Sequence, residues 1–354
     1  MSDYPTYEHA SAAPAAPLRA RDFGLGVGQL PTGPHNALTD VPGVRVGHAT
    51  RIEGHAIRTG LTAILPHGES VYTRRVPAAV HTINGFGKAM GFEQVRELGT
   101  LETPILLTNT LNVGRAADAL ISEMVAQDPE IWSLNALVGE CNDSYLNAIH
   151  ERVIGPTDVR EALTSAHGGP VPEGCVGAGT GTSCYGFKGG IGTSSRRIGD
   201  HTLGVLLQTN FGAREELRMG GAPVGWLLRD IGLPGSLPAG SVMIVIATDA
   251  PLSARQLGRV ARRAAFGLAR TGTVCHHGSG DFVIAFGTTW PQTTRADGPW
   301  LDALFTAAVD SIEEAVYNAL IAAHTLTGRE GHTLHALPHA ALRDILSRYR
   351  PDTP

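Results

Sequence analysis

Short apolar runs alternate with glycine-rich turns along most of the chain. Four runs have the apolar, β-type character of strands: 44–47, 61–65, 104–108 and 201–210. Between them, apolar positions share one helical face in 115–127, and a second helix is expected over 157–167, where Thr157 and Asp158 open it. The pattern therefore alternates strands with helices.

The last third of the chain predicts a strand, a helix, a strand and a long helix in that order. These segments are 242–247, 253–270, 282–286 and 300–323. In the last of them the acidic residues Asp310, Glu313 and Glu314 are expected on the solvated face. Apolar strands covered by helices imply a layered α/β body.

Two segments lack the sustained spacing of apolar residues that is typical of a helix or a strand. Residues 1–35 are expected to form a loose N-terminal arm that joins a single domain over 36–354. Residues 212–240 contain several glycines and prolines, which favours a mobile connector.

Composition narrows the class of protein. The 354 residues can bury a large core, and 28 basic against 33 acidic residues give a net charge of −5, which does not favour nucleic acid. No apolar stretch is long enough for a membrane span, and no secretory signal is recognisable. Four cysteines without C-x-x-C spacing look like reduced thiols, so a cytoplasmic enzyme is expected.

The pair Gly240-Ser241 carries the most chemical information. A glycine carbonyl is unobstructed, and glycine can adopt the backbone angles of a strained bond, so the next hydroxyl could attack it. Ser241 would then begin a new chain, and its α-amine, with a pKa near ~8, could serve as the base for its own hydroxyl. Taken alone, such a pair is more often an ordinary loop-to-strand junction.

Two other segments supply polar groups of the right kind. Ser279 and Asp281 are two residues apart at the start of a predicted strand, so their side chains would share one face and could orient an ammonium. Asn210, at the end of an apolar strand, offers an amide that could stabilise an oxyanion. Without context, residues of all three kinds at such positions are more often turn and cap residues.

Taken together and in order, the motifs of this chain resemble those of the DmpA family of serine N-terminal-nucleophile aminopeptidases. The resemblance spans roughly residues 20–346. Its carriers are NALTDVPGVRVGH (36–48), LTNT (107–110), VGECNDSYLN (138–147), QTNFG (208–212), GSV (240–242), ATDAPL (247–252) and GSGD (278–281).

The resemblance implies a four-layer αββα sandwich and a precursor that cuts itself between Gly240 and Ser241. The products would be an α chain of residues 1–240 and a β chain of residues 241–354, assembled as a homotetramer of αβ units. The implied substrate is a peptide, aminoacyl amide or ester with a free N-terminus, and no cofactor or metal is required. The resemblance does not fix the substrate side chain.

Residue roles also follow from the resemblance. It implies that Ser241 is the nucleophile and that Tyr145 and Asn210 lie near the oxyanion. Ser279 and Asp281 match the helper hydroxyl and acid, although Asp281 replaces the glutamate of some members. Two further matches are Glu140, for the substrate's amino group, and Asn109, as a site-lining residue.

The sequence contains two other motifs and leaves two alternative functions open. The glycine-rich segment 177–182 lacks the pattern of a phosphate-binding loop and favours a structural turn. His332, His335 and His339 have helical spacing, but Pro338 interrupts it, which favours solvated histidines over metal ligands. An acyltransferase of the ornithine acetyltransferase type would be expected to carry threonine in place of Ser241. An uncleaved, non-catalytic family member is the remaining alternative.

Overall fold

Two β-sheets stacked face to face form the centre of the molecule in the computed structural model, which describes residues 18–232, 240–290 and 297–349. The first sheet contains, in spatial order, β1 (Arg45–Glu53), β2 (Ile57–Leu65), β6 (Ile105–Asn109), β7 (Leu137–Cys141) and β4 (Ala89–Met90). The second contains β10 (Ile191–Ile198), β11 (His201–Asn210), β12 (Ser241–Thr248), β13 (Gly280–Gly287), β3 (Val76–Gly85) and β5 (Thr100–Leu101). β12 pairs antiparallel with β11 and parallel with β13.

The two sheets share one apolar layer. Val46 and Leu107 of the first sheet and Met243 and Val245 of the second are buried in the same cluster. Met243 lies over Gly139 of β7. A side-chain carbon on Gly139 would come within 2.2 Å of Cε of Met243, so a larger residue there would force the Met243 side chain to shift.

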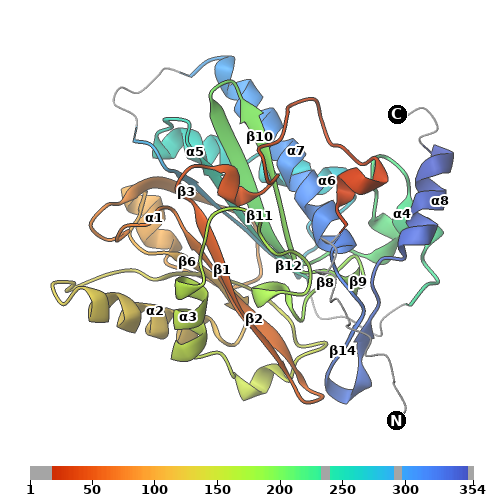
Figure 1. The fold of residues 1–354 in the computed structure, drawn as a ribbon, viewed down its shortest axis with the longest axis horizontal. Helices are drawn as coiled ribbons and strands as arrows, with labels where there is room; N and C mark the ends of the chain where they lie inside the picture. The colour runs from red at the N-terminus through yellow and green to blue at the C-terminus, as the bar shows by residue number, and fades with distance from the viewer. Residues whose placement is uncertain (1–17, 233–239, 291–296, 350–354) are drawn as a thin grey trace, which may run out of the picture.

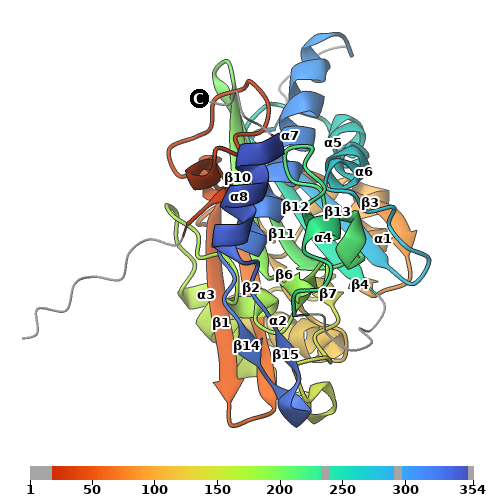
Figure 2. The same cartoon turned by 90° about the vertical axis from the view of Figure 1, so that its right-hand side faces the viewer.

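Helices cover both outer faces of this pair of sheets (Figure 1, Figure 2). The α-helices are α1 (Phe92–Leu98), α2 (Val113–Gln127), α3 (Pro156–Thr164), α4 (Val224–Leu227), α5 (Ala254–Ala261), α6 (Ala264–Arg270), α7 (Trp300–Ile321) and α8 (His339–Tyr349). α2 and α3 pack on the first sheet, whereas α5, α6 and α7 pack on the second. The expected four-layer αββα sandwich is confirmed. Among the described helices, none has the length and apolar character needed to cross a bilayer.

Shorter elements complete the described chain. Two small ribbons pair β8 (Ser183–Cys184) with β9 (Phe187–Lys188) and β14 (Leu326–Thr327) with β15 (Thr333–Leu334). The 3-10 helices are Ala20–Phe23, Leu38–Asp40, Ile149–Glu151, Gly177–Gly179, Arg214–Glu216 and Arg329–Gly331.

The N-terminal segment packs against the body from residue 18 onward, where a loose arm was expected. Ala20 and Leu25 are buried in the core beside α7. Glu314 of α7 accepts hydrogen bonds from Arg21 at 2.8 Å and from Arg196 of β10 at 2.6 Å. Because these partners lie far apart in sequence, local composition could not predict this packing. Residues 1–17 of the predicted arm lie outside the described residues.

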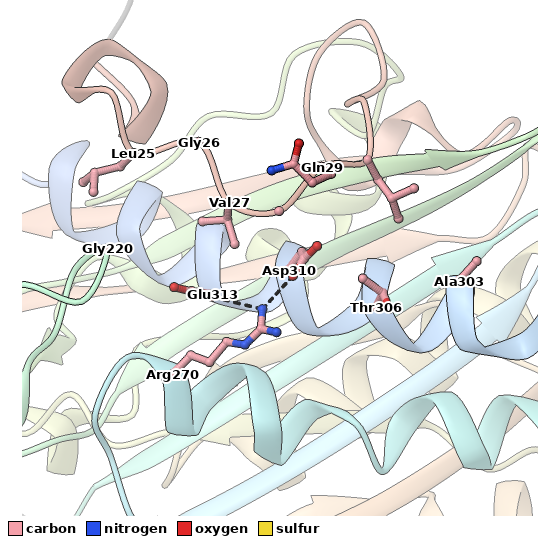
Figure 3. A pocket seen from close by; sticks show the side chains of 12 residues that line it. Leu25, Gly26, Val27, Gln29, Gly220, Arg270, Ala303, Thr306, Asp310 and Glu313 are labelled. Atoms are coloured by element: carbon pink, nitrogen blue, oxygen red, sulfur yellow. Dashed lines mark hydrogen bonds and ion pairs between the residues drawn. The ribbon is translucent and has the colours of Figure 1, made fainter. Parts of the chain in front are cut away.

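The acidic residues of α7 are buried, contrary to the expected solvated face. Glu314 forms the contacts above, and Asp310 and Glu313 both face Arg270 of α6, with Asp310 at 2.6 Å (Figure 3). These two carboxylates and Arg270 line a cavity of about 570 Å³ beneath residues 25–30. Each carboxylate is neutralised by an arginine from another element, which the helical period alone could not reveal.

The expectation of a mobile connector over 212–240 is wrong for its described part. Residues 213–232 contain α4, and Leu217, Met219 and Val224 are buried in the core. Residues 233–239 of that segment lie outside the described residues. The single helix expected over 253–270 is divided into α5 and α6, and the close approach of Gly267 to Ile312 lets α6 lie against α7.

Candidate active site

Ser241 is the first residue of β12 and lies between two neighbouring strands. It is paired with Asn210 of β11 and with Gly280 of β13. Every second side chain of a strand points to the same face of the sheet. Met243 and Val245 of β12 face the first sheet, so the Ser241 side chain points into the same layer. There its Oγ accepts a hydrogen bond from the backbone N–H of Asn142 at 3.4 Å. The side chain is buried, with 3% of the residue exposed.

Gly240 presents its carbonyl to β13. Its oxygen accepts a hydrogen bond from the N–H of Gly280 at 3.1 Å. A side-chain carbon on Gly240 would lie 3.1 Å from the Asn210 carbonyl oxygen and 3.2 Å from Cα of Phe211. Glycine supplies room at this point.

The Asn210 side chain has a fixed orientation. Its Oδ1 accepts hydrogen bonds from the backbone N–H and from the hydroxyl of Ser183, both at 3.1 Å. Within the described part of the chain its Nδ2 makes no hydrogen bond, and it lies on the same face of the sheet as Ser241. The amide therefore has a donor available beside the serine.

Ser279 and Asp281 contact each other, as the sequence predicts. The Ser279 hydroxyl donates to Oδ1 of Asp281 at 2.5 Å. Burial raises the pKa of Asp281, and hydrogen bonds from Ser279 and the Cys275 thiol offset part of that rise. Asp281 is paired with Val242, so its side chain points to the face opposite the Ser241 hydroxyl. Cys275 is thus a neighbour of this carboxylate.

Glu140 is a buried carboxylate at the end of β7. Its Oε1 accepts from the backbone N–H of Lys88 at 3.1 Å, and its Oε2 accepts from the Thr110 hydroxyl. Burial raises its pKa, which these two donors only partly counter. The space at Gly87 is bounded by this carboxylate and by Gly280: a side-chain carbon there would be 3.3 Å from Oε1 and 3.1 Å from Cα of Gly280. Glu140 therefore lies next to the residue paired with Ser241.

Asn109 belongs to a buried hydrogen-bond network, and its role as a site-lining residue stays a prediction. Its Nδ2 donates to Oγ1 of Thr59 at 2.8 Å and to Oδ2 of Asp143 at 3.2 Å, and its Oδ1 accepts from Asn112. Asp143 also accepts from Asn147 at 3.0 Å, and burial raises its pKa to about 6. The network braces the turn that follows β7 and carries Asn142.

Tyr145 lies on the same turn, and its ring stacks on His332 with 4.6 Å between ring centroids and 9° between planes. The Nδ1 of His332 also lies 2.9 Å from the Tyr145 carbonyl oxygen. His332 was expected to be solvated, and no local sequence signal links it to Tyr145. The placement of the Tyr145 hydroxyl near an oxyanion stays a prediction.

The other motifs have structural explanations. Residues 177–182 contain a 3-10 turn, as predicted. His339 lies 3.0 Å from the Ile321 carbonyl oxygen and not in a cluster with other histidines. Across 18–232, 240–290 and 297–349, no three His, Cys, Asp or Glu side chains are grouped as a metal ion would need.

Comparison with known proteins gives consistent matches over nearly the whole chain. The model of peptidase family S58 matches residues 36–334. A β-peptidyl aminopeptidase, BapA from Sphingosinicella microcystinivorans, is 40% identical, with 96% of this chain and 95% of BapA covered. Among solved structures, a β-aminopeptidase from Burkholderia sp. superposes with a TM-score of 0.87 at 41% identity, covering 94% of this chain and 99% of that one.

A second solved structure is the L-aminopeptidase D-Ala-esterase/amidase from Ochrobactrum anthropi, a variant of the Ntn hydrolase fold. It superposes with a TM-score of 0.86 at 40% identity, and the match covers 94% of this chain and 98% of that one.

Proposed function

The chain belongs to peptidase family S58 and is a serine aminopeptidase of the DmpA type, and on that premise we propose that Ser241 becomes its N-terminal nucleophile after self-cleavage. The observation that carries the proposal is the hydrogen bond from Gly280 N–H to the Gly240 carbonyl oxygen, at the bond to be cut. When the Ser241 hydroxyl adds to that carbonyl, negative charge develops on an oxygen that already has a donor.

The proposed self-cleavage has two steps, an acyl shift from nitrogen to oxygen and hydrolysis of the resulting ester. The Ser241 oxygen replaces its own nitrogen on the Gly240 carbonyl carbon, and the hydroxyl proton goes to that nitrogen, which leaves an ester and a free amine. Water then hydrolyses the ester, so that Gly240 ends in a carboxylate and Ser241 begins the second chain. The α chain would contain residues 1–240 and the β chain residues 241–354 of one domain.

In the mature enzyme the Ser241 α-amine would take the proton from its own hydroxyl. A free α-amine has a pKa near ~8, so a useful fraction is neutral at working pH. Asp281 of β13 is on the strand next to this nitrogen and across the sheet plane from the hydroxyl, and Ser279, just before that strand, is hydrogen-bonded to it. These two residues are therefore suited to hold the amine rather than to activate the hydroxyl directly.

Three further residues complete the proposed chemistry. The Nδ2 of Asn210 would donate to the oxyanion of the substrate, with Tyr145 as a second donor. Glu140 would pair with the substrate's ammonium, so an acylated N-terminus would leave a buried acid without a partner. The proposed substrates are N-terminal aminoacyl amides, peptides and esters, and the relatives named for β-peptides make β-amino acids a candidate first residue.

We also propose how the protein assembles and that it is located in the cytoplasm. The family resemblance supports a homotetramer of αβ units, which light scattering on the purified protein would test. The four cysteines are all free thiols, which fits the reducing conditions of a cytoplasm.

Ser241→Ala tests the proposed function, with Ser122→Ala on the exposed side of α2 as the matched control. The wild type and the control are expected to give two bands on a denaturing gel, one with the N-terminal sequence Ser-Val-Met. Both should also hydrolyse β-alanyl or alanyl p-nitroanilide, but not the N-acetylated forms. Ser241→Ala should give one band and no turnover. Cleavage or turnover in that variant would assign the chemistry to another nucleophile.

A further inference from the structure

The glycine-rich segment 177–182 and β8 wrap around a buried lysine. The Nζ of Lys188 donates to three backbone carbonyls, those of Gly179 at 3.0 Å, Thr182 at 2.7 Å and Gly189 at 2.7 Å. Lys188 has no exposed surface. The carbonyls of this glycine-rich loop thus bind an ammonium, and this fixes the conformation of the residues leading into Ser183.

The same loop is fastened to β11 on both sides of Asn210. The N–H of Gly190 donates to Oγ1 of Thr209 at 2.9 Å, and the N–H of Tyr185 donates to the Phe211 carbonyl at 2.7 Å. Thr209 and Phe211 are the two chain neighbours of Asn210. The loop therefore has little freedom to move relative to this residue.

Ser183 directs two donors at one atom, Oδ1 of Asn210. One of them is a backbone N–H, which can never accept a hydrogen bond, so the amide cannot rotate by 180° without placing two N–H donors against each other. The Ser183 hydroxyl adds the second bond. The Nδ2 group is consequently turned away from Ser183 toward the face that carries Ser241.

We propose that Ser183 is a positioning residue that holds the Asn210 amide with its donor aimed at the reacting carbonyl, and that the loop around Lys188 exists to present it. This inference rests on the proposed function, in which Asn210 stabilises the oxyanion. Asn210 was found by its motif, whereas Ser183 lies outside every motif that the sequence singled out.

Ser183→Ala removes the hydroxyl bond and keeps the N–H bond. In fully cleaved protein, verified on a gel, kcat for a free-amine anilide is expected to fall about 3- to 10-fold with KM unchanged. Thr248→Val is the matched control, because Thr248 loses a buried hydroxyl bond, to the Thr202 carbonyl at 2.8 Å, at the end of β12 opposite to Ser241. Its kcat should stay at the wild-type value.

A double-mutant cycle separates positioning from general damage. Asn210→Ala alone is expected to lower kcat about 100-fold or more. Adding Ser183→Ala to Asn210→Ala should then change kcat by less than about 2-fold, since nothing is left to position. The inference is overturned if Ser183→Ala equals the wild type, or if it lowers kcat by the same factor with and without Asn210. Full activity in Asn210→Ala would instead contradict the oxyanion role in the proposed function.

Discussion

The hydroxyl and the backbone nitrogen of Ser241 have different neighbours. The hydroxyl points into the layer between the sheets, on the same face as Asn210 and next to Asn142. Asp281 lies on the adjacent strand but on the other face, and Ser279, just before that strand, is hydrogen-bonded to it. The carboxylate can therefore influence the nitrogen of Ser241 more readily than its oxygen.

Replacing Asp281 by Asn should lower the pKa of the free Ser241 amine, because a nearby carboxylate favours the ammonium form. The amine acts as a base only when neutral, so the acid limb of kcat/KM should move to lower pH by about one pH unit or more. Asp281→Glu keeps the charge and should keep the limb near its wild-type position. The pH profile of kcat/KM for anilide hydrolysis measures the position of the acid limb. If the limb of Asp281→Asn coincides with that of the wild type, Asp281 does not have the proposed role.

Replacing Glu140 by Gln should raise KM for free-amine substrates about 10-fold or more, because a hydrogen bond to a charged group is lost. Burial raises the pKa of Glu140, and only its ionised form attracts an ammonium. In the wild type, kcat/KM should therefore decline as the pH falls through this raised pKa, and Glu140→Gln should lack that decline.

The matched control for this prediction is Glu93→Gln, an exposed residue of α1. Initial rates at several pH values would measure both variants. Equal KM values for Glu140→Gln and the control would place amine recognition elsewhere.

At the scale of elements, the apolar strands of the second sheet were predictable, whereas its polar strands β3 and β10 were not. β11 has the bounds that its pattern predicts, and β13 extends the predicted strand to Gly280 and Gly287. β3 was missed because its second half mixes polar and apolar side chains without a clean alternation. β8 was missed because it is only two residues long, too short for a periodic pattern, and its pairing with β9 and its bridge to Phe211 appear only in the folded chain.

Gly240 is predicted to be required for its small volume at the junction between the loop and β12. In Gly240→Ala the new carbon would press on the Asn210 carbonyl oxygen at 3.1 Å. A strain of about 1–3 kcal/mol should slow self-cleavage roughly 5- to 100-fold without preventing folding. Gly258→Ala in α5 is the control, since its new carbon would meet Ala79 at an ordinary 3.6 Å. A time course on denaturing gels after expression measures the rate, and equal rates would contradict the steric explanation.

At the scale of the whole molecule, buried charges join segments that are far apart in sequence. Arg196 of β10 and Glu314 of α7 are both fully buried, and Arg21 and Asn36 of the N-terminal segment bind the same carboxylate. The site motifs could be recognised from sequence because each is a contiguous run. Ser183, Cys275 and His332 could not, because each acts through a contact made only when distant segments pack.

Breaking this network should lower the free energy of unfolding, and the loss should be larger where the removed side chain is more deeply buried. Arg196→Met leaves a buried carboxylate without one of its cations and should lower the free energy of unfolding by about 3 kcal/mol or more. The Arg21 side chain is 44% exposed, so Arg21→Met should lower the free energy of unfolding by about 1 kcal/mol or less. Urea denaturation followed by circular dichroism measures both, and equal losses would contradict the assignment of the network as a link between segments.

The most direct measurement of the central claim is the intact mass of freshly purified, fully active protein under denaturing conditions. The account predicts two polypeptides, one of them residues 241–354 with a free serine amine at its start, whose masses together exceed that of the unbroken chain by one water. A single unbroken polypeptide with full aminopeptidase activity would contradict it.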